Sequence, residues 1–93
     1  MYRKPEYIDW DEANTSHIEA ADLTPEEVES VLDAPDGAAL PSEGAPAGVE
    51  RWIVFGTTDT GKHVAVVFEI LCDDPFYIRP ITAFEVPEQG AVE

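Results

Sequence analysis

The stretch from His63 to Leu71 restricts the fold more than any other, because apolar side chains occupy both of its alternating faces. One face carries Val64, Val66, Phe68 and Ile70, and the other carries Ala65, Val67 and Leu71. A strand with this pattern is central in a sheet and covered on both sides. Arg51 to Thr57 is similarly rich in β-forming residues, and the Asp59-Thr60-Gly61 turn between the two runs predicts an antiparallel hairpin.

A third strand is predicted from Phe76 to Phe84, after the turn at Cys72-Asp73-Asp74-Pro75. Pro80 lies inside this strand and removes one donor from the ladder, which favours a sheet edge or a bulge at that position. Glu6 to Asp9 is a candidate additional strand, so the sequence predicts three or four strands.

Two helices are expected before the sheet. The capping box Thr24-Pro25-Glu26-Glu27 places the start of a helix at Pro25, and this helix ends around Asp33. An earlier helix is predicted from Trp10 to Ala21, with Asp9 or Asp11 as its N-cap and a face that mixes apolar and polar side chains.

The fold class predicted from these elements is α+β, with two N-terminal helices packed on a three- to four-stranded antiparallel sheet. A length of 93 residues fits one domain, residues 1–93. The Ala/Pro/Gly-rich segment at residues 34–48 is predicted to be a flexible, non-catalytic loop.

Acidic residues dominate the charge: 20 Asp and Glu face five Lys and Arg, for a formal net charge of -15. Proteins that bind nucleic acid take much of their affinity from clustered cations, so this composition makes RNA an unlikely partner and excludes DNA. The same acidity is also typical of proteins adapted to high salt, and the sequence leaves both explanations open.

The setting expected from the sequence is the cytoplasm. Cys72 is the single cysteine, so no disulfide can form within the chain. The opening residues show no signal peptide, and the longest apolar run, Val64 to Phe68, is too short to span a membrane.

Three residues are candidates for catalysis: Arg79, His17 and His63. Metal-free RNA cleavage needs a base, an acid and a cation, and these are the residue types that supply them. Each also has a structural interpretation: a salt bridge for Arg79, helix packing for His17 and an exposed strand end for His63. Lys62 and Arg51 are expected to be ordinary surface charges. No metal-ligand spacing is present, and we expect no metal or cofactor.

Several motifs together resemble the BrnT-like toxin family. They are Trp10-Asp11-Glu12, Asn14, His17-Ile18, Leu23 to Leu32, Gly56-Thr57-Thr58, Gly61-Lys62, Val66-Val67-Phe68 and Ile78 to Ala83. The resemblance implies a RelE-like fold and a ribonuclease toxin that is neutralised by an antitoxin. However, the chain has Ala21-Asp22 where the family carries a His-Gly pair, Phe84 where an arginine is usual, and no tyrosine-bearing tail.

The resemblance and its departures lead to three functional hypotheses. The first is a non-catalytic BrnT-like protein that acts as a protein–protein interaction module, with an antitoxin-like or basic protein as its partner. The second is a ribonuclease toxin of a type II toxin–antitoxin system that uses Arg79, His17 and His63. The third is an acidic mimic of nucleic acid that binds a basic protein, for which the net charge is the only motive.

Overall fold

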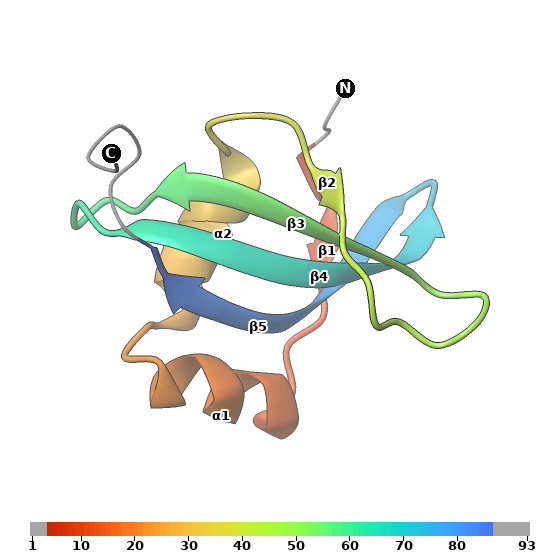
Figure 1. Cartoon of the computed structure of the whole chain (residues 1–93), viewed down its shortest axis with the longest axis horizontal. Helices are drawn as coiled ribbons and strands as arrows, with labels where there is room; N and C mark the ends of the chain where they lie inside the picture. Colours follow the sequence, from red (N-terminus) through yellow and green to blue (C-terminus); the bar gives the residue numbers. More distant parts are fainter. Residues whose placement is uncertain (1–3, 87–93) are drawn as a thin grey trace.

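Five strands form one sheet in the order β1-β5-β4-β3-β2 in a computed structural model that describes residues 4–86 (Figure 1). The elements in chain order are β1 (Tyr7–Ile8), α1 (Glu12–Ala20), α2 (Pro25–Asp33), β2 (Leu40–Pro41), β3 (Glu50–Thr57), β4 (His63–Asp73) and β5 (Phe76–Glu85). The α+β class is confirmed. Residues 87–93, where the resemblance implies a tyrosine-bearing tail, lie outside the described residues.

The prediction of three or four antiparallel strands is confirmed in part, because the sheet has five strands and one of them runs parallel to its neighbour. β1 pairs in parallel with β5, through Tyr7 opposite Tyr77 and Ile8 opposite Ile78, so the sheet is mixed. The fifth strand, β2, lies inside the 34–48 segment and pairs with Ile53 and Trp52 of β3. β1 lies within the candidate strand expected at Glu6 to Asp9. β2 was not expected, because its two residues are too few for an alternating pattern to be visible in the sequence.

The predicted meander of β3, β4 and β5 is confirmed, with β4 at its centre. Pro80 faces Phe68, and the pairing of β4 with β5 shifts register between Val67 and Phe68. This irregularity is the bulge that the proline predicted, since proline cannot donate to the ladder.

Both helices form where the sequence placed them. α2 begins at Pro25 after a complete capping box and buries Val28, Val31 and Leu32. α1 is two residues shorter at its start than predicted, because Asp11 is its N-cap. Neither helix, nor any other within residues 4–86, has the length and apolar character needed to cross a bilayer.

The two helices lie on one side of the sheet: α2 packs behind β3 and β4, and α1 lies along β5 (Figure 1). We call this side the helix-covered face; its members are Val54, Gly56, Val64, Val66, Phe68, Ile78 and Ala83, all buried. The helix approaches closely at Gly56, where an added Cβ would meet Val31 Cγ1 at 3.0 Å. The hydrophobic core therefore forms between the helices and this face.

The opposite side, which we call the open face, carries Ile53, Phe55, Ala65, Val67, Thr82 and Phe84. No helix within residues 4–86 covers it, and Phe55 and Phe84 are 40% and 42% exposed. In the described part of the chain β4 therefore has no second layer of helices on this side, although its Ala65 is fully buried. Alternating apolar residues reveal two apolar faces but not whether a second layer exists to cover them.

Candidate functional site

Arg79, the leading candidate from the sequence, is held by two carboxylates. Its Nη1 lies 3.0 Å from Asp9 Oδ2 and 2.5 Å from Asp11 Oδ2. Asp9 directly follows β1, which runs beside the part of β5 that carries Arg79. The salt bridge that the sequence offered as the structural interpretation of Arg79 is confirmed.

Asn14 of α1 fixes the geometry of this ion cluster. Its side-chain amide donates to the carbonyls of Asp9 and Pro80, both at 2.9 Å, and its oxygen accepts from the Asp11 N–H at 2.8 Å. Asn14 is almost fully buried, and its amide thus joins the chain before α1 to β5. Asp11 also accepts from the Asn14 N–H as the N-cap of α1, so its position is set by the helix as well as by Arg79.

The electrostatics of the cluster favour the charged forms. The hydrogen bond from Arg79 lowers the pKa of Asp11, helped by the Asn14 N–H. The same bond to Asp11, followed by that to Asp9, raises the pKa of Arg79. One cation thus faces two anions, and the guanidinium is compensated before any phosphate could approach.

The two histidines do not join Arg79. His17 is exposed on α1, so the packing role expected for it is wrong, and His63 Nδ1 lies 3.3 Å from Thr57 Oγ1 at the start of β4. Arg79 faces Glu69 on β4, six positions from His63, which is about 20 Å along a strand. Within residues 4–86 no hydrogen bond or ion pair links either imidazole to Arg79.

The other described cations are also paired. Arg51 Nη2 lies 2.6 Å from Glu69 Oε2, and Lys62 Nζ lies 3.4 Å from Glu27 Oε2. The side chains of Arg51 and Lys62 are only 22% and 28% exposed, so they are not the ordinary surface charges that the sequence suggested. Lys4 Nζ reaches Asp33 at 4.0 Å. Each cation placed in residues 4–86 therefore has a carboxylate beside it.

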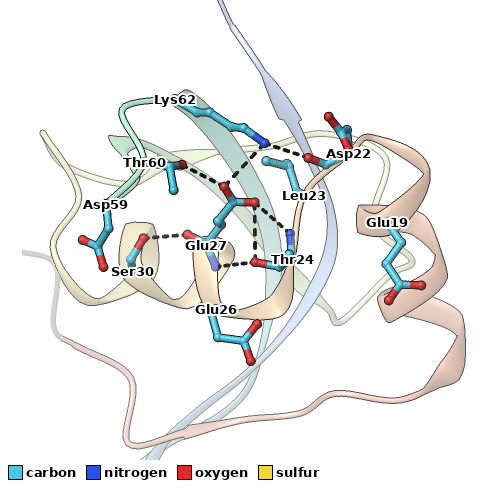
Figure 2. A pocket seen from close by; sticks show the side chains of 10 residues that line it. All are labelled: Glu19, Asp22, Leu23, Thr24, Glu26, Glu27, Ser30, Asp59, Thr60 and Lys62. Atoms are coloured by element: carbon cyan, nitrogen blue, oxygen red, sulfur yellow. Dashed lines mark hydrogen bonds and ion pairs between the residues drawn. The ribbon is translucent and has the colours of Figure 1, made fainter.

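A groove of about 600 Å³ lies between the α1–α2 connection, the start of α2 and the β3–β4 turn (Figure 2). It is lined by Glu19, Asp22, Leu23, Thr24, Glu26, Glu27, Ser30, Asp59, Thr60 and Lys62. Carboxylates outnumber the single cation of this lining, which makes the groove a poor site for an anionic substrate.

Glu27 organises this groove through what we call the Glu27 network. One carboxylate oxygen accepts from the Thr24 N–H at 3.0 Å, and the other accepts from Thr60 Oγ1 at 2.9 Å beside Lys62. Lys62 Nζ also donates to the Asp22 carbonyl at 2.9 Å. Figure 2 shows these bonds running from α2 to the β3–β4 turn, with the Glu26 side chain directed away from them.

The Glu27 network is built to hold structure together. The hydrogen bond from Thr60 is the main cause of a lowered pKa for Glu27, so this carboxylate stays ionised at neutral pH. An acid with a lowered pKa and satisfied oxygens is a weak general base. The sequence identified Glu27 through the capping box, but not its contacts with Thr60 and Lys62, which come from the hairpin 33 residues further on.

No protein family, curated protein or solved structure matches this chain.

Proposed function

We propose that this chain is a non-catalytic protein–protein interaction module, built on a BrnT-like scaffold of the RelE-like fold. The observation that carries the proposal is the state of Arg79, whose Nη1 is held by Asp9 and Asp11 and whose charge these two carboxylates compensate. Metal-free RNA cleavage needs a cation that is free to stabilise a charged phosphate, with an acid and a base beside it. Arg79 lacks that freedom and has neither imidazole as a neighbour.

The backbone conformation at Asp22 supports a scaffold that resembles the family's but lacks one of its histidines. The resemblance expects a His-Gly pair where this chain has Ala21-Asp22. Asp22 has a φ of 64°, in the left-handed region that favours glycine. The backbone shape that suits a glycine is thus kept at this position, while Ala21 brings no imidazole.

Phe84 supports the same conclusion on the last strand. The resemblance expects an arginine at this position, whereas Phe84 is 42% exposed on the open face. An exposed aromatic ring offers a contact surface to a protein and no charge to a phosphate. The substitution moves this position from anion binding towards protein binding.

A cleavage assay tests the proposal. Purified protein is mixed with end-labelled single-stranded RNA in the presence of a chelator, beside the variants Arg79→Ala, His17→Ala and His63→Ala. We expect no cleavage above background from any of the four proteins. Metal-independent cleavage by the wild-type chain that is lost in Arg79→Ala would contradict the proposal.

The double variant Asp9→Asn/Asp11→Asn is the matched control, because it releases Arg79 without removing it. We expect this variant to remain inactive, since no acid or base stands beside the freed guanidinium. If releasing Arg79 instead produces RNA cleavage, the carboxylates mask an active site, and the proposal is wrong.

A further inference from the structure

Part of the open face carries no charged side chain. Two neighbouring rows across the strands make up this surface, which we call the neutral patch. Its members are Leu40, Ile53, Val67 and Thr82 in one row and Phe55, Ala65 and Phe84 in the next. Leu40, Phe55 and Phe84 are 53%, 40% and 42% exposed, and adjoining exposed apolar side chains in a small protein mark a binding surface.

The carboxylates of the chain lie away from the neutral patch. The sequence holds 20 Asp and Glu among its 93 residues, yet neither row contains one. Glu85 directly follows Phe84 in the sequence but lies opposite Val64 of the helix-covered face. Asp59 follows β3 but lines the Glu27 groove. The patch is thus neutral although the molecule is strongly acidic.

Paired charges close the neutral patch at one end. Arg51, Glu69 and Arg79 form the next row of the open face. Arg51 pairs with Glu69 at 2.6 Å, and Arg79 is held by the two carboxylates described above. An added Cβ on Gly44 would lie 3.5 Å from the Arg51 guanidinium, so the 42–49 segment lies over this end of the face (Figure 1). The uncovered surface therefore ends here, and the charges at its border already have partners.

A partner of the neutral patch must itself be apolar and uncharged where it makes contact. A Lys or Glu side chain buried against Phe55 or Val67 would lose its water without gaining an ion pair, and an unpaired buried charge is costly. An aliphatic side chain in the same place is stabilised by the apolar surface that it buries. The choice of partner thus follows from the side chains of the patch and not from the net charge of the molecule.

The neutral patch is small for a broad protein surface. Strands lie about 4.8 Å apart and rows on one face about 6.6 Å apart, so its seven positions cover about 220 Å². A stable interface buries about 800 Å² on each partner. In a dimer of this chain the contact could not grow past one end of the patch, because the 42–49 segment of each copy lies there. The area therefore favours a narrow partner segment over a second copy.

A single helix matches the width of the neutral patch. Phe55 and Phe84 lie on the strands either side of β4, which places their backbones about 10 Å apart. A helix with its side chains is about 10 Å across, so one helix along β4 contacts both rings, whereas an extended strand, about 5 Å wide, contacts one. Helices already cover the other face of the sheet, and a partner helix would supply the layer that a second apolar face requires.

We propose that the neutral patch binds one amphipathic helix of a partner protein, through an aliphatic stripe that is free of charged side chains. Two rows span about 13 Å along the strands, which is about nine residues of helix. The stripe covers Leu40, Phe55 and Phe84, and the polar side of the helix faces water. This inference rests on the proposed function and deepens it by naming the surface and the chemistry of the partner.

The test uses three synthetic peptides of about 18 residues, long enough to form about five helical turns. The first contains Leu with equal numbers of Glu and Lys, and its leucines recur at helical spacing to form an apolar stripe. The second has the same composition in an order that forms no stripe. The third is the striped peptide with its central Leu replaced by Lys. Calorimetry measures the three affinities, and amide chemical shifts of the labelled protein locate the contact.

We expect the striped peptide to bind about tenfold more tightly than the rearranged one, with shift changes centred on Phe55, Ala65 and Phe84. The Lys-bearing peptide should also bind about tenfold more weakly than the striped one, although its extra positive charge suits a chain of net charge -15. Raising salt from about 0.05 M to about 0.5 M should change the affinity of the striped peptide by less than about twofold, because no ion pair contributes to it.

Substitutions on the protein test the same contact. The variant Phe55→Ser/Phe84→Ser should remove the preference for the striped peptide. Leu71→Ser is the matched control, since Leu71 is 48% exposed on the same strand as Ala65 but lies beyond the row of paired charges. Circular dichroism of each variant separates loss of binding from loss of fold. Phe84→Ser alone serves where the double variant does not fold, and we expect it to lose part of the preference.

Several outcomes would overturn this assignment. They are equal binding of the striped and rearranged peptides, tighter binding of the Lys-bearing peptide, an affinity that falls steeply with salt, and shift changes centred on the Glu27 groove. Each of them leaves the absence of RNA cleavage intact, so this inference and the proposed function can fail separately. A dimer of the protein that is abolished by Phe55→Ser/Phe84→Ser would also overturn it, because a second copy would then occupy the patch.

Discussion

The helix-covered face and the open face of the same sheet differ in what their side chains do. On the helix-covered face Val64, Val66 and Phe68 are buried against α1 and α2. On the open face, Phe55 and Phe84 keep two fifths of their surface in water. One face therefore stabilises the domain, and the other is free to contact a partner at little cost to the fold.

Two cations also stabilise the fold, through ion pairs with carboxylates. Arg79 and Lys62 each connect a strand or its turn to the helical side of the molecule, through Asp11 and Glu27. They act as structural ties within the chain. This difference between structural contacts and the exposed rings of the open face can be tested by substitutions on each side.

The largest expected effect is on the helix-covered face. Phe68→Ala removes a buried ring and leaves a cavity, so we expect the free energy of unfolding to fall by about 3–5 kcal/mol. The matched variant Phe84→Ala on the open face should change it by less than about 1 kcal/mol. Chemical denaturation measures both, and similar losses would remove the distinction between the faces.

The next effect concerns the connection between α1 and β5. Asn14→Ala removes a buried amide and leaves the carbonyls of Asp9 and Pro80 without their donor. An unsatisfied buried acceptor costs on the order of 1–3 kcal/mol, and we expect a loss of about 2 kcal/mol. The exposed neighbour variant Ser16→Ala should leave the unfolding midpoint unchanged, whereas an equal loss in both would show that Asn14 holds nothing in particular.

A smaller effect is expected where α2 meets the sheet. The Cβ introduced by Gly56→Ala would lie 3.0 Å from Val31 Cγ1 and 3.6 Å from Val31 Cα. Overpacking of this kind costs about 1–2 kcal/mol. Gly37→Ala is the control, because nothing lies within 4 Å of its added Cβ. A stabilised Gly56→Ala variant would show that the helix does not press on this face.

The Glu27 network should show itself in the pH dependence of stability. The pKa of Glu27 is lowered from its ordinary value of 4.5. Glu27 therefore stabilises the folded state above pH 4.5, and this stabilisation is lost as the pH falls further. We expect Glu27→Gln to unfold at a lower temperature than the wild-type chain at pH 7, with the difference shrinking in acid. Glu26→Gln lacks these contacts and should show no such pH-dependent difference.

The smallest effect is expected from salt. A net charge of -15 destabilises the compact state through self-repulsion, and salt screens it. We expect the unfolding temperature to rise by a few degrees, about 1 kcal/mol, between low salt and about 0.5 M sodium chloride. A lower unfolding temperature at high salt would show that the ion pairs stabilise the fold by more than the repulsion destabilises it.

Local signals allowed much of the fold to be predicted from the sequence. The capping box fixed the start of α2 at Pro25, and the apolar runs located β3, β4 and β5 with the bulge at Pro80. A strand near β1 was expected, but its parallel pairing with β5 was not, and β2 was not expected at all. A two-residue strand shows no alternating pattern, and its pairing depends on the neighbouring strand. The open face was missed for a similar reason, since alternation does not reveal what covers a strand.

The candidate site was predicted less completely. Arg79 was identified because a cation on an apolar strand requires a partner, and a structural salt bridge was the favoured partner. Asp9 and Asp11 are about 70 residues away, so their identity depended on β1 lying beside β5. No local pattern connects Glu27 to the hairpin residues Thr60 and Lys62, and these contacts became visible only in the folded chain.

The most direct test of the account is the stability of Arg79→Met, which keeps a long side chain and removes the charge. If Arg79 is a structural tie, the variant unfolds at a lower temperature than the wild-type chain, because Asp9 and Asp11 are left facing each other. Adding Asp9→Asn and Asp11→Asn should recover part of the loss. An Arg79→Met variant as stable as the wild-type chain, or more stable, would contradict the account and indicate that the arginine is kept for a substrate.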